Sequence, residues 1–376
     1  MGYIKDITPK IMRYHLHRLG LLSPGAPLNF TFSVTNVCQS RCRTCSIWKL
    51  YRDNPLRRDE ELELDEIEKI FRSLGHVYLF NISGGEPFLR PDLPQIIEFA
   101  CEYIRPAVIH IPTNAIAVDL VEKKTLEILN IINKNNPAIQ FTIKPSLDHI
   151  GERHDDIRGV KGNFDKVIIL FNRLKKYKSQ FSNLHVELGT IISSWNVNDI
   201  EEISQFALGM SPDSYRNEIA EKRSEMFNIE DPITPEVDFY RKAVDIFVRQ
   251  IQEKKRNISF FQRINNAFRI VYYQIAIRVM EKNTQVIPCY AGISNAHMSP
   301  YGDIWPCCTL GYEMSMGNLR DYNYDFKLLW NSPDAKKIRK YIKDKKCCCP
   351  LANQTYSNIL MHLPSLTKVL KKIILD

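Results

Sequence analysis

Strand-like and helical segments alternate from Phe30 to about Ala207, and this alternation restricts the fold more than any other feature of the chain. Runs typical of strands lie near residues 30–36, 77–83, 107–113, 139–147 and 185–192. Runs typical of helices lie near residues 65–74, 93–104, 120–134, 165–178 and 197–208. Such alternation is typical of parallel strands joined by helical crossovers. The sequence therefore predicts an α/β fold with ligand-binding loops at the carboxyl ends of the strands.

Three cysteines, Cys38, Cys42 and Cys45, follow the first strand-like run in a C-x3-C-x2-C pattern. Four thiolates would occupy every iron of an iron–sulfur cube. Three thiolates in one short loop leave one iron open, and an open iron can bind and activate a ligand. The alternative is a zinc knuckle, which needs a fourth Cys or His nearby. None lies between Cys45 and His76, so the pattern favours a cluster.

A second motif, Gly84-Gly85-Glu86-Pro87, ends the second strand-like run. A glycine pair after a strand is often a tight turn, but bare backbone also lets a ligand approach closely. Together with the three cysteines, this motif resembles the radical SAM superfamily, whose proteins bind S-adenosylmethionine on the open iron of a [4Fe–4S] cluster. The resemblance implies that Gly84, Gly85 and Glu86 bind the methionyl amino group.

The resemblance also implies a reaction and further binding residues. In that family an electron from the cluster cleaves S-adenosylmethionine, and the resulting 5′-deoxyadenosyl radical removes hydrogen from a C–H bond. Similar motifs in the family lie near the ribose and carboxylate of the cofactor. Here they contain Asn114 and Ser146, which follow the third and fourth strand-like runs, and Arg158. Turn, capping and surface-pairing roles are the alternatives for these three residues.

A second group of cysteines lies near the C-terminus. Cys289 and Cys307 stand in a C-x12-G-x4-C pattern, and Cys347, Cys348 and Cys349 follow. This resembles the auxiliary-cluster domain of radical SAM proteins, in its one-cluster ("twitch") form rather than the longer SPASM form. The resemblance implies a second [4Fe–4S] cluster on Cys289, Cys307, Cys347 and Cys349, with Cys308 and Cys348 spare. The choice among the three adjacent cysteines stays open, and a zinc ribbon is the alternative to a cluster.

These features divide the 376 residues into four expected segments. Residues 1–29 hold a basic amphipathic helix that starts with Thr8 as N-cap and stops at Gly20. By resemblance, residues 30–215 form the radical SAM core, a partial (β/α)6 TIM-like barrel. Residues 216–285 read as a helical connection, and residues 286–376 as the small auxiliary-cluster domain. The residues Arg216, Asn217 and Glu218 fall where a sixth strand should end, so they face either substrate or solvent.

Composition limits the setting of the protein. Ten cysteines without a secretory signal favour metal ligands over disulfides, and a reducing cytoplasm is expected. The net charge of +8 accompanies no nucleic-acid motif. No apolar run reaches the roughly 18 residues of a spanning helix. Cys101, in an apolar helical stretch, is expected to be a buried core thiol.

Two basic segments near the C-terminus each have two interpretations. The run from Lys336 to Lys346, beside Cys347, is either a solvated helix face or a dock for an acidic electron donor or an anionic substrate. The last helix either packs on the auxiliary domain or contacts a membrane surface. Its expected apolar face contains Leu366, Val369, Leu370, Ile373 and Ile374.

Three functions are compatible with these motifs. The favoured one is an oxidoreductase-type radical SAM enzyme acting on a small molecule, such as a sugar, lipid or cofactor precursor. In it the auxiliary cluster transfers electrons, and a flavodoxin or ferredoxin supplies them. A peptide-modifying enzyme is the alternative, although no segment is left over for a peptide-binding domain. A non-catalytic electron carrier or sensor leaves Gly84 to Pro87 unexplained. The sequence assigns no catalytic residue, and it leaves open whether S-adenosylmethionine is consumed or regenerated.

Overall fold

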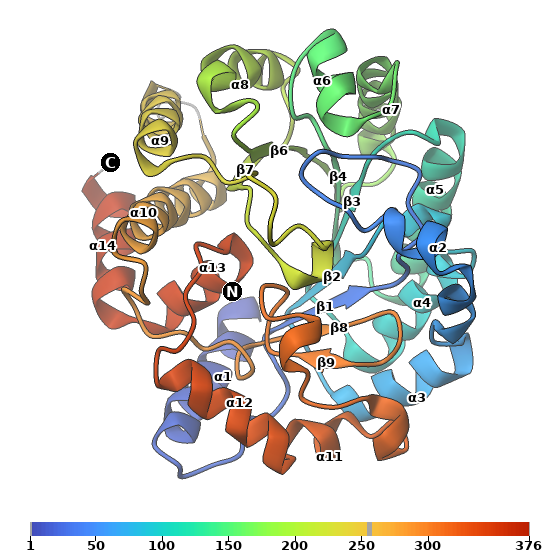
Figure 1. Cartoon of the computed structure of the whole chain (residues 1–376), viewed down its shortest axis with the longest axis vertical. Coiled ribbons are helices and arrows are strands. Elements are labelled where there is room, and N and C mark those ends of the chain that lie inside the picture. The colour runs from blue at the N-terminus through green and yellow to red at the C-terminus, as the bar shows by residue number, and fades with distance from the viewer. Residues whose placement is uncertain (1, 254–257, 376) are drawn as a thin grey trace.

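A partial barrel of mainly parallel strands, covered on its outside by helices, forms the centre of the molecule (Figure 1). The computed structural model describes residues 2–253 and 258–375. One sheet has the strand order β5-β4-β3-β2-β1-β8-β9, and β6 pairs with β7 in a second sheet. A bridge between Ser146 and Gly189 joins the end of β4 to β6. The two sheets therefore follow one another around the barrel.

The strands are short, and every pair is parallel except β8 with β9. The four predicted strands before residue 150 correspond to β1 to β4, and the fifth run splits into β5 and β6. The bounds are β1 Asn29–Ser33, β2 Leu79–Ser83, β3 Val108–Thr113, β4 Gln140–Pro145, β5 Leu184–Val186, β6 Leu188–Ile192, β7 Tyr215–Ile219, β8 Asn295–Met298 and β9 Ile304–Trp305.

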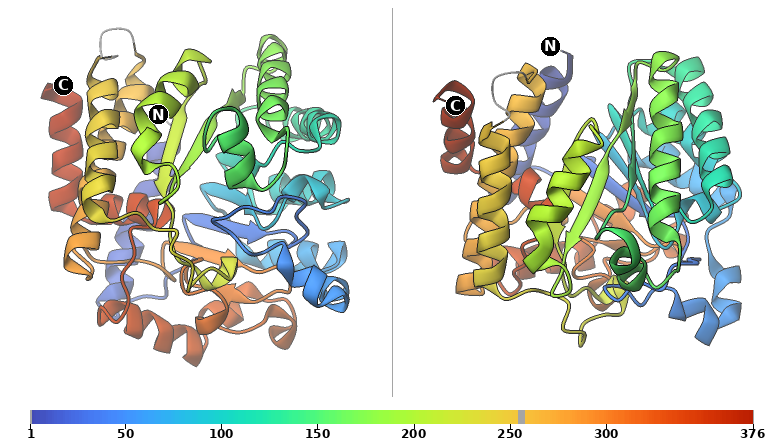
Figure 2. Two further views of the ribbon diagram at one scale, coloured as in Figure 1. Left: turned by 45° about the horizontal axis from the view of Figure 1, so that its top comes forward. Right: turned by 90° about the horizontal axis from the view of Figure 1, so that it is seen from above.

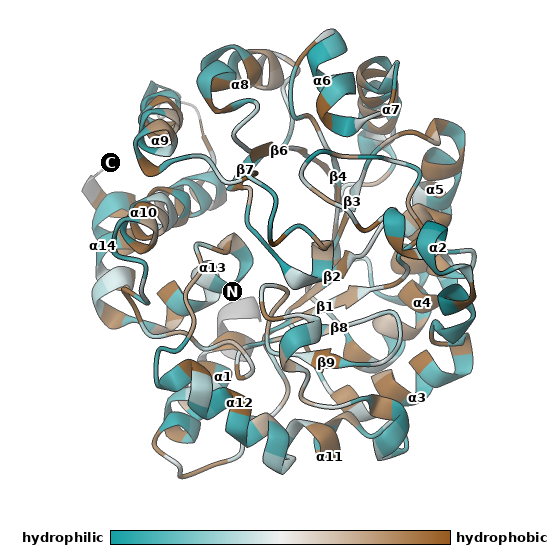
Figure 3. Cartoon of the chain, in the orientation of Figure 1, coloured by the Kyte–Doolittle hydropathy of each residue, from teal (hydrophilic) through white to brown (hydrophobic). Residues whose placement is uncertain are grey.

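Helices between successive strands form the outer layer, as the alternation predicted. Hydrophobic and hydrophilic residues alternate along them (Figure 3), as expected for helices that bury one side on a sheet. The bounds are α2 Lys49–Asp53, α3 Leu64–Leu74, α4 Leu93–Phe99, α5 Val118–Asn135, α6 Gly151–Arg158, α7 Asn163–Lys176 and α8 Ile200–Gly209.

The first crossover helix shows why the sequence folds in this way. Helix α3 begins with a capping box in which Glu63 and Glu66 bind each other's backbone N–H groups. Its Phe71 ring packs edge-on against Phe80 of β2 and Phe30 of β1, with centroids 5.5 and 6.3 Å apart. Burying each such ring contributes about 1.5–3 kcal/mol. The cluster fixes the strand from which the three-cysteine loop leaves.

The barrel interior is polar near β7. Arg216 donates two hydrogen bonds to Glu187, at 2.5 and 3.0 Å, and Lys144 of β4 lies 3.8 Å from Glu218. Arg216 and Glu218 therefore lie inside the sixth strand, whereas the sequence placed them at its end. Strand β7 runs from Tyr215 to Ile219, so the sixth strand begins at the residue where the predicted core ends.

Among the described residues up to 375, the C-terminal segment forms no sheet of its own. Strand β8 pairs with β1 in the main sheet, from Asn29 opposite Asn295 to Phe32 opposite Met298. The predicted helical connection of residues 216–285 contains α9 Val237–Glu253 and α10 Phe260–Lys282, but its first residues belong to β7. After β9 come α11 Phe326–Trp330, α12 Pro333–Lys343, α13 Ala352–Met361 and α14 Leu363–Leu375.

The terminal helices differ from expectation. Helix α1 runs from Gly2 to Arg18 and contains Pro9, so the prediction that Thr8 starts it was wrong. In α14, Val369 is buried against the protein, but Leu370 and Ile374 are 49 % and 79 % exposed. The predicted apolar face is therefore split between core and surface. Figure 2 shows α14 beside α10 at the edge of the molecule. Within the described ranges, no helix is both long and apolar enough to span a bilayer.

Candidate functional site

The loop after β1 carries Cys38, Cys42 and Cys45, and the glycine pair of β2 holds its beginning in place. The Gly85 N–H donates to the Thr35 oxygen and the Glu86 N–H to the Val37 oxygen, both at 2.8 Å. A Cβ at Gly84 would lie 2.2 Å from the Thr35 oxygen, and one at Gly85 would lie 2.4 Å from the Val37 oxygen. The glycines are thus required for contact between two loops of the chain itself. Their predicted contact with a ligand stays a prediction.

Cys42 lies within electrostatic reach of both Cys38 and Cys45. Burial raises the pKa of Cys38 to about 12, and the neighbouring Cys42 thiol raises it further in the same direction. Burial likewise raises the pKa of Cys45, with smaller contributions from Cys42 and Cys38. Three partly buried thiols in one short loop are suited to a shared cationic metal centre, which stabilises thiolates. The donor set therefore fits a cluster held by three cysteines.

Arg158 lies beside these thiols with part of its hydrogen-bonding capacity unused. Its Nη1 donates to Asp148 at 3.0 Å, and its charge lies within electrostatic reach of Cys42 and Cys38. The side chain is buried, and its Nε has no hydrogen-bond partner among the described residues. A buried unpaired N–H is costly unless a ligand accepts from it. The site can therefore bind an anionic group, which would interact with the Arg158 charge and accept a hydrogen bond from its Nε.

Glu86 is almost fully buried and is already engaged by the chain. Its carboxylate accepts hydrogen bonds from the Thr113 hydroxyl at 2.9 Å, from the Asn114 N–H at 2.7 Å and from the Phe88 N–H at 3.3 Å. Burial raises its pKa to about 7, while these hydrogen bonds oppose the shift. Glu86 thus ties the end of β2 to the end of β3. Its expected bond to an ammonium remains a prediction.

Asn114 and Ser146 lie at the same edge of the barrel. The Asn114 Nδ2 is 3.8 Å from the Cys38 sulfur, so the structure brings this residue to the cysteine loop. Ser146 is half-buried and its N–H donates to the Thr113 oxygen at 3.0 Å. The ends of β2, β3 and β4 therefore lie side by side, as expected for parallel strands, and the residue after β3 contacts Cys38.

The second cysteine group lines one cavity. Cys289, Cys307, Cys347, Cys348 and Cys349 surround it, together with apolar residues of α10 and the amides of Gln285 and Asn358. The loop that carries the adjacent cysteines is fixed by Gln285, whose Nε2 donates to the Cys347 oxygen at 2.9 Å.

Electrostatic contacts link the thiols of this cavity. Cys349 lies within reach of Cys307 and Cys289, and Cys347 lies within reach of Cys289 and Cys348. The Cys348 thiol also donates to the Asn283 side-chain oxygen, 3.4 Å away. The expected set of four, with Cys348 as a spare, stays a prediction.

A third group was not anticipated from the sequence. The donor atoms of Glu225, His297 and Cys308 lie within 4.8 Å of one another. The Ser33 hydroxyl donates to Glu225 at 2.9 Å and lies 2.8 Å from His297 Nε2. Glu225 and His297 belong to no motif, and only the fold brings them together. Cys308, the other spare, faces this group instead of the cavity.

The loop of residues 220–228 lies between the two cysteine groups. Glu225 is close enough to Cys45 to raise its pKa, and Glu221 is close enough to Cys349 to do the same. The Met226 oxygen accepts from the Ser46 N–H at 2.9 Å. Chemistry that uses both cysteine groups would take place beside this loop.

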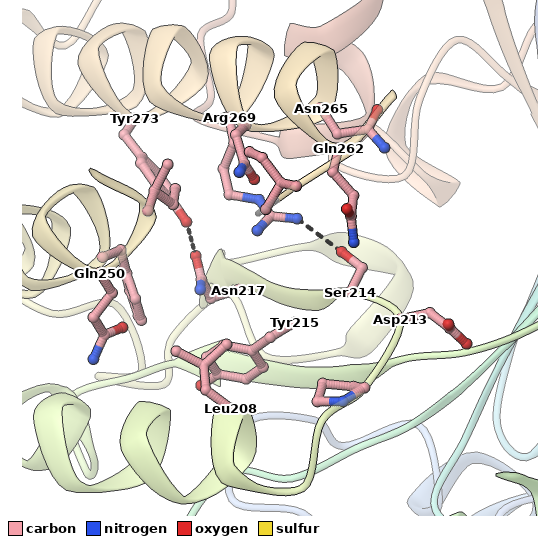
Figure 4. Close-up of a pocket in the computed structure, with 15 residues that line it drawn as sticks. Leu208, Asp213, Ser214, Tyr215, Asn217, Gln250, Gln262, Asn265, Arg269 and Tyr273 are labelled. Carbon is pink, nitrogen blue, oxygen red and sulfur yellow. Dashed lines mark hydrogen bonds between the residues drawn. The ribbon is translucent and has the colours of Figure 1, made fainter. Parts of the chain in front are cut away.

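A separate polar cavity of about 180 Å³ lies between β7, α9 and α10 (Figure 4). Tyr273 donates a hydrogen bond to Asn217 there, and Arg269 Nη2 donates to the Ser214 hydroxyl at 3.0 Å. Asn217 thus lines this cavity, away from the cysteine loop. No cysteine lines it.

Comparisons with family models match both cysteine groups. The model described as "Radical SAM superfamily" matches residues 32–207. The SPASM model, described as "Iron-sulfur cluster-binding domain", matches residues 289–350.

Two curated relatives align with most of the chain. The subtilosin biosynthesis protein AlbA of Bacillus subtilis is 23 % identical over 319 residues, covering 83 % of this chain and 61 % of AlbA. The AdoMet-dependent heme synthase of Methanosarcina barkeri is 22 % identical, covering 84 % and 85 %. The Fe-coproporphyrin III synthase of the same organism is 29 % identical over 46 % of this chain and 39 % of its own length. The chain thus spans less than two thirds of AlbA and of that synthase.

Two solved structures have a similar fold. SuiB of Streptococcus suis, bound to its precursor peptide SuiA, aligns with a TM-score of 0.57 at 15 % identity, over 86 % of this chain and 69 % of SuiB. The protein anSMEcpe, with bound AdoMet and a Cp18Cys peptide, aligns with a TM-score of 0.57 at 15 % identity, over 92 % and 99 %.

Proposed function

Because this chain is a radical SAM enzyme with a C-terminal iron–sulfur cluster-binding domain, we propose that it modifies a peptide. When bound, the open-iron cluster and S-adenosylmethionine supply an electron and a 5′-deoxyadenosyl radical, which removes hydrogen from substrate. The chain itself holds, orients and encloses the reactants. This proposal replaces the small-molecule substrate that the sequence favoured.

The observation that carries the peptide assignment is the alignment with AlbA, a bacteriocin biosynthesis protein, over 319 residues. The similar fold of SuiB, solved with a precursor peptide, supports the same assignment. The earlier objection was the lack of a peptide-binding domain. This objection is weaker because anSMEcpe, solved with a Cp18Cys peptide, aligns with this chain over 99 % of its own length.

The geometry supports specific roles for this chain's residues. Cys38, Cys42 and Cys45 would hold the open-iron cluster, and Arg158 would bind the carboxylate of S-adenosylmethionine through its unpaired Nε. Asn114, beside Cys38, would orient the same ligand. In the second cavity Cys289, Cys307, Cys347 and Cys349 would hold the auxiliary cluster.

The substrate would lie against the loop of residues 220–228, between the two clusters. Buried polar atoms with no partner among the described residues gather there, including Glu221 Oε1 and Ser224 Oγ. Carboxylate and hydroxyl oxygens of this kind can accept hydrogen bonds from the N–H groups of a peptide backbone. Since Glu221 reaches towards the auxiliary cavity and Glu225 towards Cys45, a peptide in this place would contact both sides.

A tetrapyrrole is the second candidate substrate. The heme synthase of Methanosarcina barkeri aligns over 85 % of its own length, against 61 % for AlbA, so its overall size matches better. The two candidates predict different products from the same chemistry.

The test uses the anaerobically reconstituted protein with S-adenosylmethionine and a reductant. One reaction contains a candidate precursor peptide encoded beside the gene, and the other contains Fe-coproporphyrin III. Chromatography with mass detection follows 5′-deoxyadenosine and each substrate. We expect a mass change in the peptide alone. A mass change in the porphyrin alone would transfer the assignment to the second candidate. Absence of 5′-deoxyadenosine in both reactions would contradict radical chemistry.

A further inference from the structure

Three residues with metal-binding side chains come from separate parts of the chain and meet beside β1. Glu225 lies in the loop after β7, His297 lies on β8, and Cys308 follows β9. Glu225 and His297 are each only 4 % exposed, and Cys308 is half-buried. We call these three residues the Glu-His-Cys group. In Figure 1 the loop after β7 runs down to the orange strands β8 and β9.

The spacing of the group suits a small divalent cation. Zinc binds nitrogen and oxygen at about 2.0–2.2 Å and thiolate sulfur at about 2.3 Å, in tetrahedral geometry. Tetrahedral bonds of these lengths place neighbouring donor atoms about 3.3–3.8 Å apart. Glu225 Oε1 already lies 3.3 Å from His297 Nε2, and all three donor atoms lie within 4.8 Å of one another. Side-chain movements of about 1 Å at most would complete the geometry.

The backbone and one hydroxyl group hold the three side chains in place. The pairing of β8 with β1 fixes His297. A Cβ at Gly311 would lie 3.0 Å from the Glu225 nitrogen and 3.3 Å from the Cys308 oxygen, so a side chain there would crowd both loops. The Ser33 hydroxyl donates to Glu225 at 2.9 Å. Hydrogen bonds of this kind orient a carboxylate that binds a metal. The group is therefore preorganised.

The charges around the group favour a cation. Arg223 lies within electrostatic reach of Cys308 and Glu225, but its guanidinium forms an ion pair with Glu221 at 2.8 Å. A metal ion deprotonates a thiol that binds it, so the group would present two negative charges, one on sulfur and one on the carboxylate. Buried charges are costly unless they are paired or bind a metal.

Two buried donors beside the group have no hydrogen-bond partner in the described part of the chain. They are Trp305 Nε1 and Ser224 Oγ. The Trp305 ring lies 5.0 Å from the His297 ring between centroids, and Ser224 directly precedes Glu225. Buried polar groups without a partner are rare, and they indicate a bound water or ion. These donors are a second indication of a ligand at this place.

We propose that the Glu-His-Cys group binds one Zn²⁺ ion, separate from both iron–sulfur sites. Mixed nitrogen, oxygen and sulfur donors suit zinc better than magnesium or calcium, which prefer oxygen. Zinc also binds such a site more tightly than Fe²⁺ in the usual order of divalent affinities. Three protein ligands leave the fourth tetrahedral position open, as in catalytic zinc sites. Water or a donor atom of a substrate beside the loop of residues 220–228 can occupy that position.

Two alternatives assign these residues differently. In the first, Cys308 is a ligand of the auxiliary cluster. The described residues that line the auxiliary cavity include Cys307 but not Cys308, which argues against it. In the second, Glu225 and His297 form an ion pair without a metal, and Cys308 has no part in it. Each alternative predicts a different metal content from the proposal.

The test supplies the anaerobically reconstituted holoprotein with one equivalent of ZnCl₂, and desalting removes loosely bound metal. Plasma mass spectrometry then measures zinc and iron per chain. We expect about one zinc ion and an unchanged iron content. Zinc K-edge X-ray absorption detects zinc without interference from iron. It should show one sulfur ligand at about 2.3 Å and two or three nitrogen or oxygen ligands at about 2.0–2.2 Å.

The variants Cys308→Ala, His297→Gln and Glu225→Gln each change one ligand. In each, the Kd for zinc, measured by competition with a chelator, should rise at least about a hundredfold while the iron content stays at the wild-type level. Glu225→Gln hardly changes the shape of the side chain, so it stays informative if another variant folds poorly. Ser33→Ala should weaken binding only about tenfold. Cys101→Ala is the matched control, because that thiol is buried in the core, and it should bind zinc like wild type.

Several results would overturn the proposal. Wild-type protein that retains no zinc would do so, as would four sulfur ligands around zinc, which would place the ion in a cysteine group. Loss of about four irons in Cys308→Ala would make this residue an auxiliary-cluster ligand instead. Unchanged zinc affinity in Glu225→Gln and His297→Gln would place the ion elsewhere. The assay contains neither substrate nor S-adenosylmethionine, so its result does not depend on the proposed function.

Discussion

The side-chain amide of Asn228 donates a hydrogen bond of 2.8 Å to the backbone oxygen of Thr44, the residue before Cys45. The same amide group of Asn228 accepts from the Arg223 N–H at 2.7 Å through its oxygen. One buried side chain therefore joins the loop after β7 to the loop of the first cysteine group. The substrate space that we propose is bounded by this connection.

Replacing Asn228 by Ala should lower the free energy of unfolding by about 1–3 kcal/mol, because it leaves the Thr44 oxygen and the Arg223 N–H unpaired inside the protein. Denaturant titration of the metal-free chain measures this loss. Asn135→Ala is the control, since that exposed amide only bonds back to Ile131 within its own helix. Its effect should stay within about 0.5 kcal/mol. Equal losses of stability in the two variants would show that Asn228 stabilises the protein no more than an exposed amide does.

Anaerobic reconstitution should load about eight irons per chain, as expected for two cubes. Replacing Cys38, Cys42 and Cys45 together by Ala should leave about four, those of the auxiliary cube. Iron and sulfide assays measure both values. Cys101→Ala is the control, because this thiol is buried among core residues, as predicted, and should not affect the iron count. An unchanged iron content in the triple variant would rule out a cluster on these three cysteines.

Replacing Cys289 and Cys307 by Ala should preserve 5′-deoxyadenosine formation under strong reductant and abolish the modified product. The reason is that the two cysteine groups are separate in space, and four cysteines leave no open iron in the auxiliary cube. One chromatographic assay measures both compounds. Loss of 5′-deoxyadenosine in a folded variant would mean that the two groups act as one unit. Product formation at the wild-type rate would leave the second group a structural role only.

Cys348 and Cys349 are adjacent in the chain but should behave differently. Cys348→Ala should keep the full iron content, because its thiol points to Asn283 at the surface. Cys349→Ala should lose the auxiliary cube's irons, because its thiol lies among Cys307 and Cys289. The two variants control for each other in the same iron assay. The reverse result would exchange their roles.

The pair Glu66–Arg320 should make stability depend on acid pH. The two side chains form two hydrogen bonds of 2.8 Å, and these lower the pKa of Glu66 from its ordinary 4.5 to about 2. Because the pKa of Glu66 is lower in the folded than in the unfolded state, the pair stabilises the folded state fully above about pH 4.5. This stabilisation is lost as the pH falls towards 2. We expect the pair to contribute about 2 kcal/mol to the free energy of unfolding. This value is reduced because Arg320 is partly exposed and solvent screens its charge.

Glu66→Gln tests this directly. Its free energy of unfolding should fall below that of wild type at pH 7, and the difference should vanish near pH 2. Asp65→Asn is the control, because Asp65 forms an exposed pair with Lys69 on the same helix. A difference between Glu66→Gln and wild type that does not change with pH would contradict the depressed pKa.

The sequence predicted the barrel well where local patterns agree with the tertiary structure. Strands β1 to β4 are short apolar runs in the sequence, and helices with one apolar side separate them. Both the apolar pattern of each run and its place in this alternation therefore identify the strands. The sixth strand was misplaced because Arg216 and Glu218 are charged, and only the polar barrel interior explains charged residues in a strand. The start of α1 was misplaced because Pro9 is tolerated within the helix.

The site was predictable to the extent that motifs carry it. Both cysteine groups converge as their spacing indicated, and both match family models. The glycine pair was predicted to contact a ligand, and that contact stays a prediction. The structure adds a role that the sequence did not indicate, because the pair seats the loop after β1. Glu225 and His297 were missed because they are far apart in the sequence and follow no pattern. Only the pairing of β8 with β1 brings His297 next to Ser33.

That pairing also bears on how the chain is made. The first strand emerges early in synthesis, but its neighbour β8 begins only at Asn295. Until then one edge of β1 has unpaired backbone groups, which favour aggregation. Contacts between distant parts of a chain also form slowly. We therefore expect that a chain shortened before β8 does not yield an independent barrel, and that the nascent protein needs protection until its last quarter is complete.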